Sequence, residues 1–142
     1  MPARTVAELL EERGVLPDIR SDEQWAAAVA SGAPAAALDA VMEAFGFTAA
    51  ELERCVITRK SAQRRRSRKE RLNADESARL ARLARVALRA EAALGSAEAA
   101  AAWMRRRNRG LQSHTPLEML DTDAGARMTE AVLGRGDHGQ VA

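Results

Sequence analysis

The apolar positions of the chain recur at the spacing of amphipathic helices. One stripe stands at i, i+3, i+4 and i+7 directly before Gly46 and consists of Leu38, Val41, Met42 and Phe45. This spacing puts the four side chains on one face of a helix. A second stripe, in the longest predicted helix, consists of Leu80, Leu83, Ala84, Ala87 and Leu88. We expect the first stripe to be mainly core, with a dimer surface as the alternative for part of it.

Capping sequences predict where the helices begin. A Ser, Thr or Asn followed three residues later by Glu or Gln satisfies free backbone groups at a helix N-terminus. Such pairs are Thr5 and Glu8, Ser21 and Gln24, Thr48 and Glu51, and Asn73 and Glu76. Other starts are expected at Ser96, at Thr122, and at Thr115-Pro116-Leu117-Glu118, where Pro takes the first helical position. A further short helix is expected from about Arg59 to Lys69.

Composition favours an all-α fold. The chain has 142 residues, no Tyr and only two Phe and two Trp, and it is rich in Ala, Leu, Arg and Glu, which favour helices over strands. Its single cysteine excludes an internal disulfide and a cysteine-based zinc site. No apolar run is long enough to span a membrane, and the first residues lack the apolar region of a signal peptide. We therefore expect a cytoplasmic protein without a membrane partner.

Charge is distributed unevenly. Residues 1–53 carry a net charge of −7, residues 54–71 carry +8, and residues 72–142 carry +1. An 18-residue basic block of this kind attracts polyanions, chiefly nucleic acid. The alternatives are a solvated helix face or a disordered basic linker.

The basic block follows a short capped helix, which is the order of a helix-turn-helix unit. With Ala62 pointing inward, Arg59, Lys60, Gln63 and Arg64 would point towards DNA. Arg pairs with guanine and Gln with adenine through two hydrogen bonds, and the other polar residues can take phosphates. The usual Gly of the turn is absent, because residues 55–57 are Cys-Val-Ile. The candidate DNA-binding residues are Arg59, Lys60, Ser61, Gln63, Arg64, Arg65 and Arg68.

No enzyme constellation is recognisable, so no catalytic residue, cofactor or metal is expected. Cys55 fits a small buried apolar residue better than a nucleophile. His114 and His138 stand in predicted loops, and neither is expected to bind a metal. The glycines of residues 134–139 have the spacing of a dinucleotide loop but follow a helix rather than a strand. Trp25 and Trp103 are expected to pack in the core.

The region from Glu51 through the basic block to Val86 resembles the DNA-binding half and connecting helix of the Xre/MbcA/ParS antitoxins. These are the partners of RES-domain toxins. Residues 95–139 resemble the toxin-binding module of the same family. The matching motifs are Trp103, Asn108-Arg109, Thr115-Pro116-Leu117-Glu118-Met119-Leu120-Asp121-Thr122, Gly125-Ala126-Arg127, Leu133-Gly134-Arg135 and His138-Gly139. Two positions differ: Gln112-Ser113-His114 replaces the usual Gly-Gly before Thr-Pro, and Gln140-Val141 replaces a hydrophobic-aromatic pair.

The resemblance implies an antitoxin that occludes the active site of a nearby-encoded RES-domain toxin, which degrades NAD or uses it for ADP-ribosylation. It also implies repression of the operon through operator DNA, by a homodimer within a hetero-oligomeric complex. Residues 1–34 would be a variable helical extension, residues 35–92 the DNA-binding and dimerisation region, and residues 93–142 the toxin-binding module. The toxin-binding residues would be Trp103, Asn108, Thr115, Pro116, Leu117, Arg127, Gly134, Arg135, His138 and Gly139.

Two other readings of the sequence remain. The chain could be a stand-alone transcriptional regulator whose C-terminal module only forms oligomers. It could also be a toxin binder whose helix-turn-helix has degenerated, with the basic block contacting an acidic partner.

Overall fold

A computed structural model describes residues 5–15 and 22–136 of the chain. Within these ranges the protein is all-α, as the sequence predicts, with nine α-helices, one 3-10 helix and no strand. The first six helices are α1 (Val6–Glu12), α2 (Asp22–Ser31), α3 (Ala36–Phe45), α4 (Ala49–Cys55), α5 (Arg59–Arg68) and α6 (Ala74–Leu94). They are followed by α7 (Ala97–Met104), η1 (Arg109–Leu111), α8 (Pro116–Met119) and α9 (Asp123–Gly134).

The predicted capping sequences begin the helices as expected. Complete capping boxes start α1 at Thr5, α4 at Thr48 and α6 at Asn73. Ser96, Thr115 and Thr122 cap α7, α8 and α9 through their side chains. The predicted cap at Ser21 lies outside the described residues. The sequence analysis did not predict η1, nor that Thr58 caps α5.

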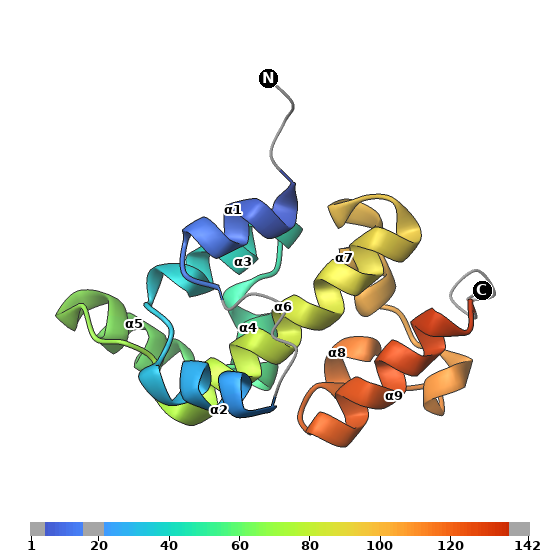
Figure 1. Cartoon of the computed structure of the whole chain (residues 1–142). Helices are drawn as coiled ribbons and strands as arrows, with labels where there is room; N and C mark the ends of the chain where they lie inside the picture. The colour runs from blue at the N-terminus through green and yellow to red at the C-terminus, as the bar shows by residue number, and fades with distance from the viewer. Residues whose placement is uncertain (1–4, 16–21, 137–142) are drawn as a thin grey trace.

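Helix α6 is the central element of the fold (Figure 1). Helices α2, α3 and α4 pack on α6 from the N-terminal side of the chain, and α7 and α9 pack on it from the C-terminal side (Figure 1). Helix α1 packs on α3, α5 on α4, and α8 on α9. Its predicted stripe is core, because Leu80, Leu83, Ala84 and Ala87 are buried. The stripe on α3 is also core, with Leu38, Val41 and Phe45 buried and only Met42 partly exposed.

The N-terminal helices pack on the same core rather than standing apart from it. Leu10 and Val15 are buried, α1 contacts α3, and α2 contacts α6. The link between α2 and α3 is also fixed, because Ala33 forms a backbone hydrogen bond with Leu72. The side chain of Trp25 lies outside the described residues, so its predicted packing stays a prediction. Among the helices described, none is long and apolar enough to cross a membrane.

Candidate DNA-binding and toxin-binding surfaces

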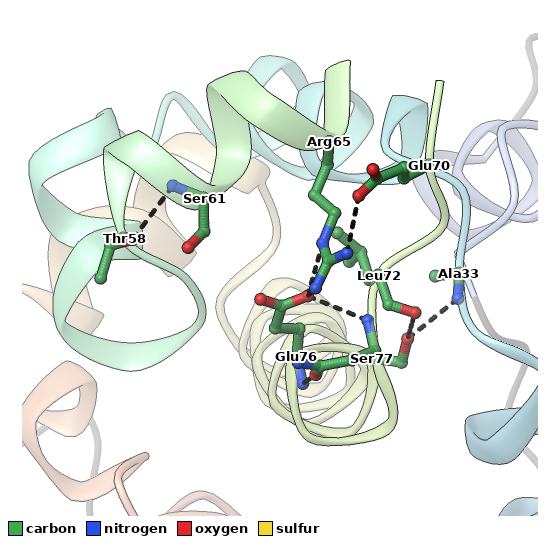
Figure 2. Close-up of polar contacts among 9 residues, drawn as sticks. Ala33, Thr58, Ser61, Arg65, Glu70, Leu72, Glu76 and Ser77 are labelled. Carbon is green, nitrogen blue, oxygen red and sulfur yellow. Dashed lines mark hydrogen bonds and ion pairs between the residues drawn. The ribbon is translucent and has the colours of Figure 1, made fainter. Parts of the chain in front are cut away.

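Helices α4 and α5 form the predicted helix-turn-helix pair, and the turn is held by apolar packing in place of a glycine. Cys55, Val56 and Ile57 are all buried in the core beside Leu52. Thr58 then accepts a hydrogen bond from the Ser61 N–H at 3.2 Å and so begins α5 (Figure 2). Ala62 is buried, so the predicted register of α5 is confirmed.

The outward face of α5 is cationic. Lys60, Arg64 and Arg68 stand at i, i+4 and i+8, which places them in one row on a helix. All three are exposed, as is Gln63 beside them, whereas Ser61 is partly covered. Neither Lys60 nor Arg64 forms an ion pair within the described part of the chain, and Arg68 lies 3.8 Å from Glu70. Lys60 and Arg64 thus present positive charge without an ion-pair partner in the described chain, and the charge of Arg68 is partly balanced by Glu70.

The neighbouring face of α5 turns towards the protein. Arg66 pairs with Asp39 of α3 at 2.8 Å, and Arg59 lies 3.6 Å from Glu53 of α4. Both line a groove of about 230 Å³ between α3, α4 and α5, whose floor includes Leu38, Leu52 and other apolar side chains. Arg59 therefore belongs to the edge of the cationic face, with part of its charge balanced.

Arg65 has a different environment from its predicted DNA-binding neighbours. Its guanidinium binds Glu70 at 2.9 Å and Glu76 at 3.1 Å, and only 15% of the side chain is exposed (Figure 2). The same Glu76 oxygen accepts the Asn73 N–H in the capping box of α6. Arg65 therefore ties the end of α5 to the start of α6, and a direct phosphate contact by Arg65 stays a prediction.

The loop after α5 is fixed from the other side by the link between α2 and α3. The Ser77 hydroxyl donates to the Leu72 carbonyl at 3.4 Å and accepts the Ala33 N–H at 2.9 Å (Figure 2). Arg71 donates to the Gly32 carbonyl at 2.8 Å. These contacts lie in or next to the core and anchor the part of the loop that leads into α6.

The C-terminal module buries three of its predicted toxin-binding residues, Trp103, Asn108 and Pro116, and leaves Thr115 and Leu117 partly exposed. Trp103 is 4% exposed and packs in the core, which confirms the prediction that it is a core residue. Pro116 is buried at the first position of α8, and Thr115 caps that helix. The buried Trp103 Nε1 has no hydrogen-bond partner among the described residues. Contact of Trp103 or Pro116 with a toxin stays a prediction, and their observed role is in the fold.

Asn108 organises the loop that precedes α8. Its Oδ1 accepts the Gly110 N–H at 2.8 Å, and its backbone bonds to residues 111, 113 and 114. Two of the residues that stand in place of the family's usual Gly-Gly pair have a glycine-like backbone conformation. Gln112 and Ser113 have φ values of 54° and 65°, so both adopt the left-handed conformation that glycine favours.

Helix α9 carries the motif residues that remain exposed. Arg127 is 70% exposed and pairs with Asp123 one turn away, and Met128 beside it is 43% exposed. Gly134 and Arg135 are exposed at the end of the helix, whereas His138 and Gly139 lie outside the described residues. Arg85 and Arg89 of α6 bind Glu130 at 2.7 and 3.1 Å, which fixes α9 on the central helix.

A cleft of about 480 Å³ separates α4 from α8. Its lining is charged and includes Glu51 and Arg54 of α4, Arg105 after α7, and Leu117, Glu118 and Asp121 of the C-terminal module. Hydrogen bonds from His114 and then Thr115 lower the pKa of Glu118. Arg105 was not among the predicted site residues, and its only signal in the sequence is its position directly after the predicted Trp103 helix.

The single cysteine and the possible metal ligands were the candidate chemistry of the sequence. Cys55 is buried as expected, and burial, followed by the charges of Asp121 and Glu51, raises its pKa to about 12. Its thiol therefore stays protonated at neutral pH and is a poor nucleophile. Among the described residues, no three or more His, Cys, Asp and Glu side chains are grouped to hold a metal ion.

Comparison with known proteins finds a family match for each of the two halves of the chain. A model of the antitoxin Xre-like helix-turn-helix domain matches residues 24–85, and a model of the antitoxin Xre/MbcA/ParS C-terminal toxin-binding domain matches residues 89–139. An Antitoxin Xre of Photorhabdus laumondii is 38% identical over 112 residues, 78% of this chain and 76% of the relative. The chain belongs to the Xre/MbcA/ParS family of antitoxins.

A second relative supports the same family. An Antitoxin Xre of Pseudomonas putida is 30% identical over 118 residues, which cover 83% of this chain and 74% of that protein. The chain is thus an antitoxin of a toxin–antitoxin system, with a helix-turn-helix domain and a toxin-binding domain. The two matched regions meet along α6, between residues 85 and 89.

Proposed function

We propose that this antitoxin inhibits a RES-domain toxin encoded beside it and represses its own promoter through α5. The observation that carries the DNA-binding half is the exposed row of Lys60, Arg64 and Arg68 on a helix in the recognition position, in which Lys60 and Arg64 have no ion-pair partner in the described chain. Basic side chains in such a row reach phosphates and base edges of the major groove. Gln63 is exposed at the edge of the groove beside this row and adds a side chain able to read adenine.

Operator binding is tested with a duplex that spans the promoter upstream of this gene. The double variant Lys60→Gln with Arg64→Gln is expected to weaken binding at least about tenfold and to reduce the salt slope by about 2. Arg66→Gln is the matched control on the same helix, because its guanidinium binds Asp39 instead of facing outward. Equal losses for the Arg66 control and an Arg64→Gln single variant would refute the assignment of the outward face.

The toxin-binding half of the proposal rests on the family of the C-terminal domain and on where α9 ends. An NAD-using toxin has a concave polar pocket, and a short cationic, glycine-containing segment fits such a pocket. Arg135 follows α9 directly, and its guanidinium can bind phosphates or a carboxylate through two hydrogen bonds. We propose that residues 135–142 occlude the pocket and that the exposed face of α9 supports them from outside.

A chain that ends at Gly134 separates the two ways of inhibiting. If this chain still binds the toxin but no longer blocks NAD consumption, the segment from 135 onward is the plug. If it inhibits as well as the full chain, helices α8 and α9 cover the active site themselves. Arg127→Gln in the full chain reports on the helix face in the same assay, because its side chain is exposed in the middle of α9.

A homodimer is part of the proposal, because operators of helix-turn-helix proteins present two half-sites about one helical turn apart. The buried stripe on α3 leaves only Met42 partly exposed there, so the dimer surface must lie largely elsewhere. Light scattering of the full chain at micromolar concentration, without DNA, should give the mass of a dimer. A strictly monomeric mass would contradict this part.

A further inference from the structure

One arginine of the toxin-binding module reaches into the helix-turn-helix. Arg105 caps the C-terminus of α7, and its guanidinium binds both carboxylate oxygens of Glu51 on α4, at 2.7 and 3.0 Å. The same guanidinium donates to the Gly46 carbonyl at 2.8 Å, where α3 ends. Its carbon also lies 5.7 Å from the centre of the Phe47 ring. One side chain thus holds the whole turn between α3 and α4 from 54 residues away in sequence.

Glu51 also caps helix α4, so its contact with Arg105 bears on the position of that helix. Its Oε1 accepts the Thr48 N–H at 2.9 Å, while the Thr48 hydroxyl accepts the Glu51 N–H, so Glu51 completes the capping box of α4. The hydrogen bond from Arg105 is the main cause that lowers the pKa of Glu51. The residue that completes the cap of α4 is therefore held in place by a group supplied by the other module. Helix α4 is also the element on which α5 rests through the buried turn of residues 55–57.

We propose that Arg105 is a positioning residue for DNA binding: it holds α4, and through α4 the recognition helix α5, at a fixed orientation to the rest of the protein. Arg105 is not a DNA contact, because its guanidinium is committed to Glu51 and Gly46. The bidentate geometry matters, since a planar guanidinium can bind a carboxylate through two parallel bonds and a lysine cannot. The inference rests on the proposed operator binding.

The variant Arg105→Gln tests it in the full chain with the same promoter duplex. Operator affinity is expected to fall about fivefold, while the salt slope stays unchanged because no phosphate contact is lost. Arg105→Lys should recover only part of the affinity, because it keeps the charge but not the two parallel bonds. Arg106→Gln is the matched control: it removes the same charge one residue later, where the exposed side chain has no ion pair in the described chain. It should change affinity less than about twofold.

Glu51→Gln gives an independent route to the same contact. Glutamine keeps a capping box with Thr48, so α4 can still begin normally, but it removes the carboxylate that Arg105 binds. Its effect on operator affinity should match that of Arg105→Gln, and the double variant should lose no more than either single one. Thermal unfolding in the same buffer shows that each variant is folded at the assay temperature. If Arg105→Gln does not fold, Glu51→Gln and Arg105→Lys carry the test.

The two proposals fail in different ways. A wild-type chain that does not bind the promoter duplex refutes the proposed repression. A wild-type chain that binds, with folded Arg105 and Glu51 variants that bind equally well, refutes only the positioning role. Additive losses in the double variant, or an equal loss in Arg106→Gln, would also overturn it.

Discussion

The two modules use their motif residues in opposite ways. On α5, the predicted binding residues Lys60, Arg64 and Arg68 are exposed in one row, and Gln63 is exposed beside them. In the C-terminal module, Trp103, Asn108 and Pro116 are buried, and Thr115 caps a helix. A surface that contacts DNA presents exposed charged and polar side chains on one helix, whereas a protein-binding module must first build a specific shape. The C-terminal motif therefore combines fold-forming positions with exposed ones at Arg127, Gly134 and Arg135, and we expect contact with a partner from the exposed ones.

The largest effect is expected for Trp103→Ala. Truncating a buried tryptophan removes apolar burial and leaves a cavity, so the free energy of unfolding should fall by about 3–5 kcal/mol. Toxin binding should be lost together with the fold of the module. Leu117→Ala, in the same module but partly exposed, is the control and should cost less. If Trp103→Ala abolishes toxin binding at an unchanged unfolding free energy in urea, Trp103 is a contact residue and the contrast between modules is broken.

Gly125→Ala should cause the next largest loss in the free energy of unfolding. A Cβ at this position would lie 1.9 Å from the Met119 carbonyl oxygen, so α8 and α9 would have to move apart. We expect a loss of about 2–3 kcal/mol by urea unfolding. Gly134→Ala is the matched control on the same helix, because no atom lies within 4 Å of its added Cβ. Comparable losses for the two variants would show that the close packing of α8 on α9 is not what requires the glycine.

Two adjacent arginines sharpen the contrast within α5. Arg64→Gln should weaken operator binding with little change in thermal stability, because its side chain is exposed and without an ion pair in the described chain. Arg65→Gln should lower the unfolding midpoint, because it removes the ion pairs with Glu70 and Glu76. Thermal unfolding and gel shifts on both variants check this. An equal reduction of the salt slope of operator binding in both variants, relative to the wild type, would indicate that both arginines contact phosphates.

The smallest expected effect is an increase in stability, in the variant Ser113→Gly. Ser113 has a φ of 65°, a conformation that costs a non-glycine residue roughly 1 kcal/mol. Ser113→Gly should therefore stabilise the C-terminal module by somewhat less than about 1 kcal/mol, since glycine also loses more chain entropy on folding. Urea unfolding measures the shift. A destabilised Ser113→Gly would show that the serine side chain contributes more than its backbone costs.

Sequence reasoning located the elements because local signals dictate them. The capping pairs and apolar spacing gave the helices, and Ala62 gave the register of α5. It could not separate Arg64 from Arg65, since the difference comes from Glu76, which is eleven residues away and brought close by the fold. Arg105 was missed for the same reason, because its partner Glu51 lies in the other half of the chain. Long-range pairing of charges leaves no local pattern in a single sequence.

The proposed inhibition is tested most directly by titrating the proposed partner, a RES-domain protein encoded beside this gene, with the full chain and following NAD consumption. The account predicts that NAD loss stops once the antitoxin saturates the toxin and that the two proteins elute together. The double variant Lys60→Gln with Arg64→Gln should inhibit as well as the wild type, because the DNA-binding face is separate from the toxin-binding module. Unchanged NAD consumption in the presence of excess wild-type chain, without co-elution, would contradict the proposed function.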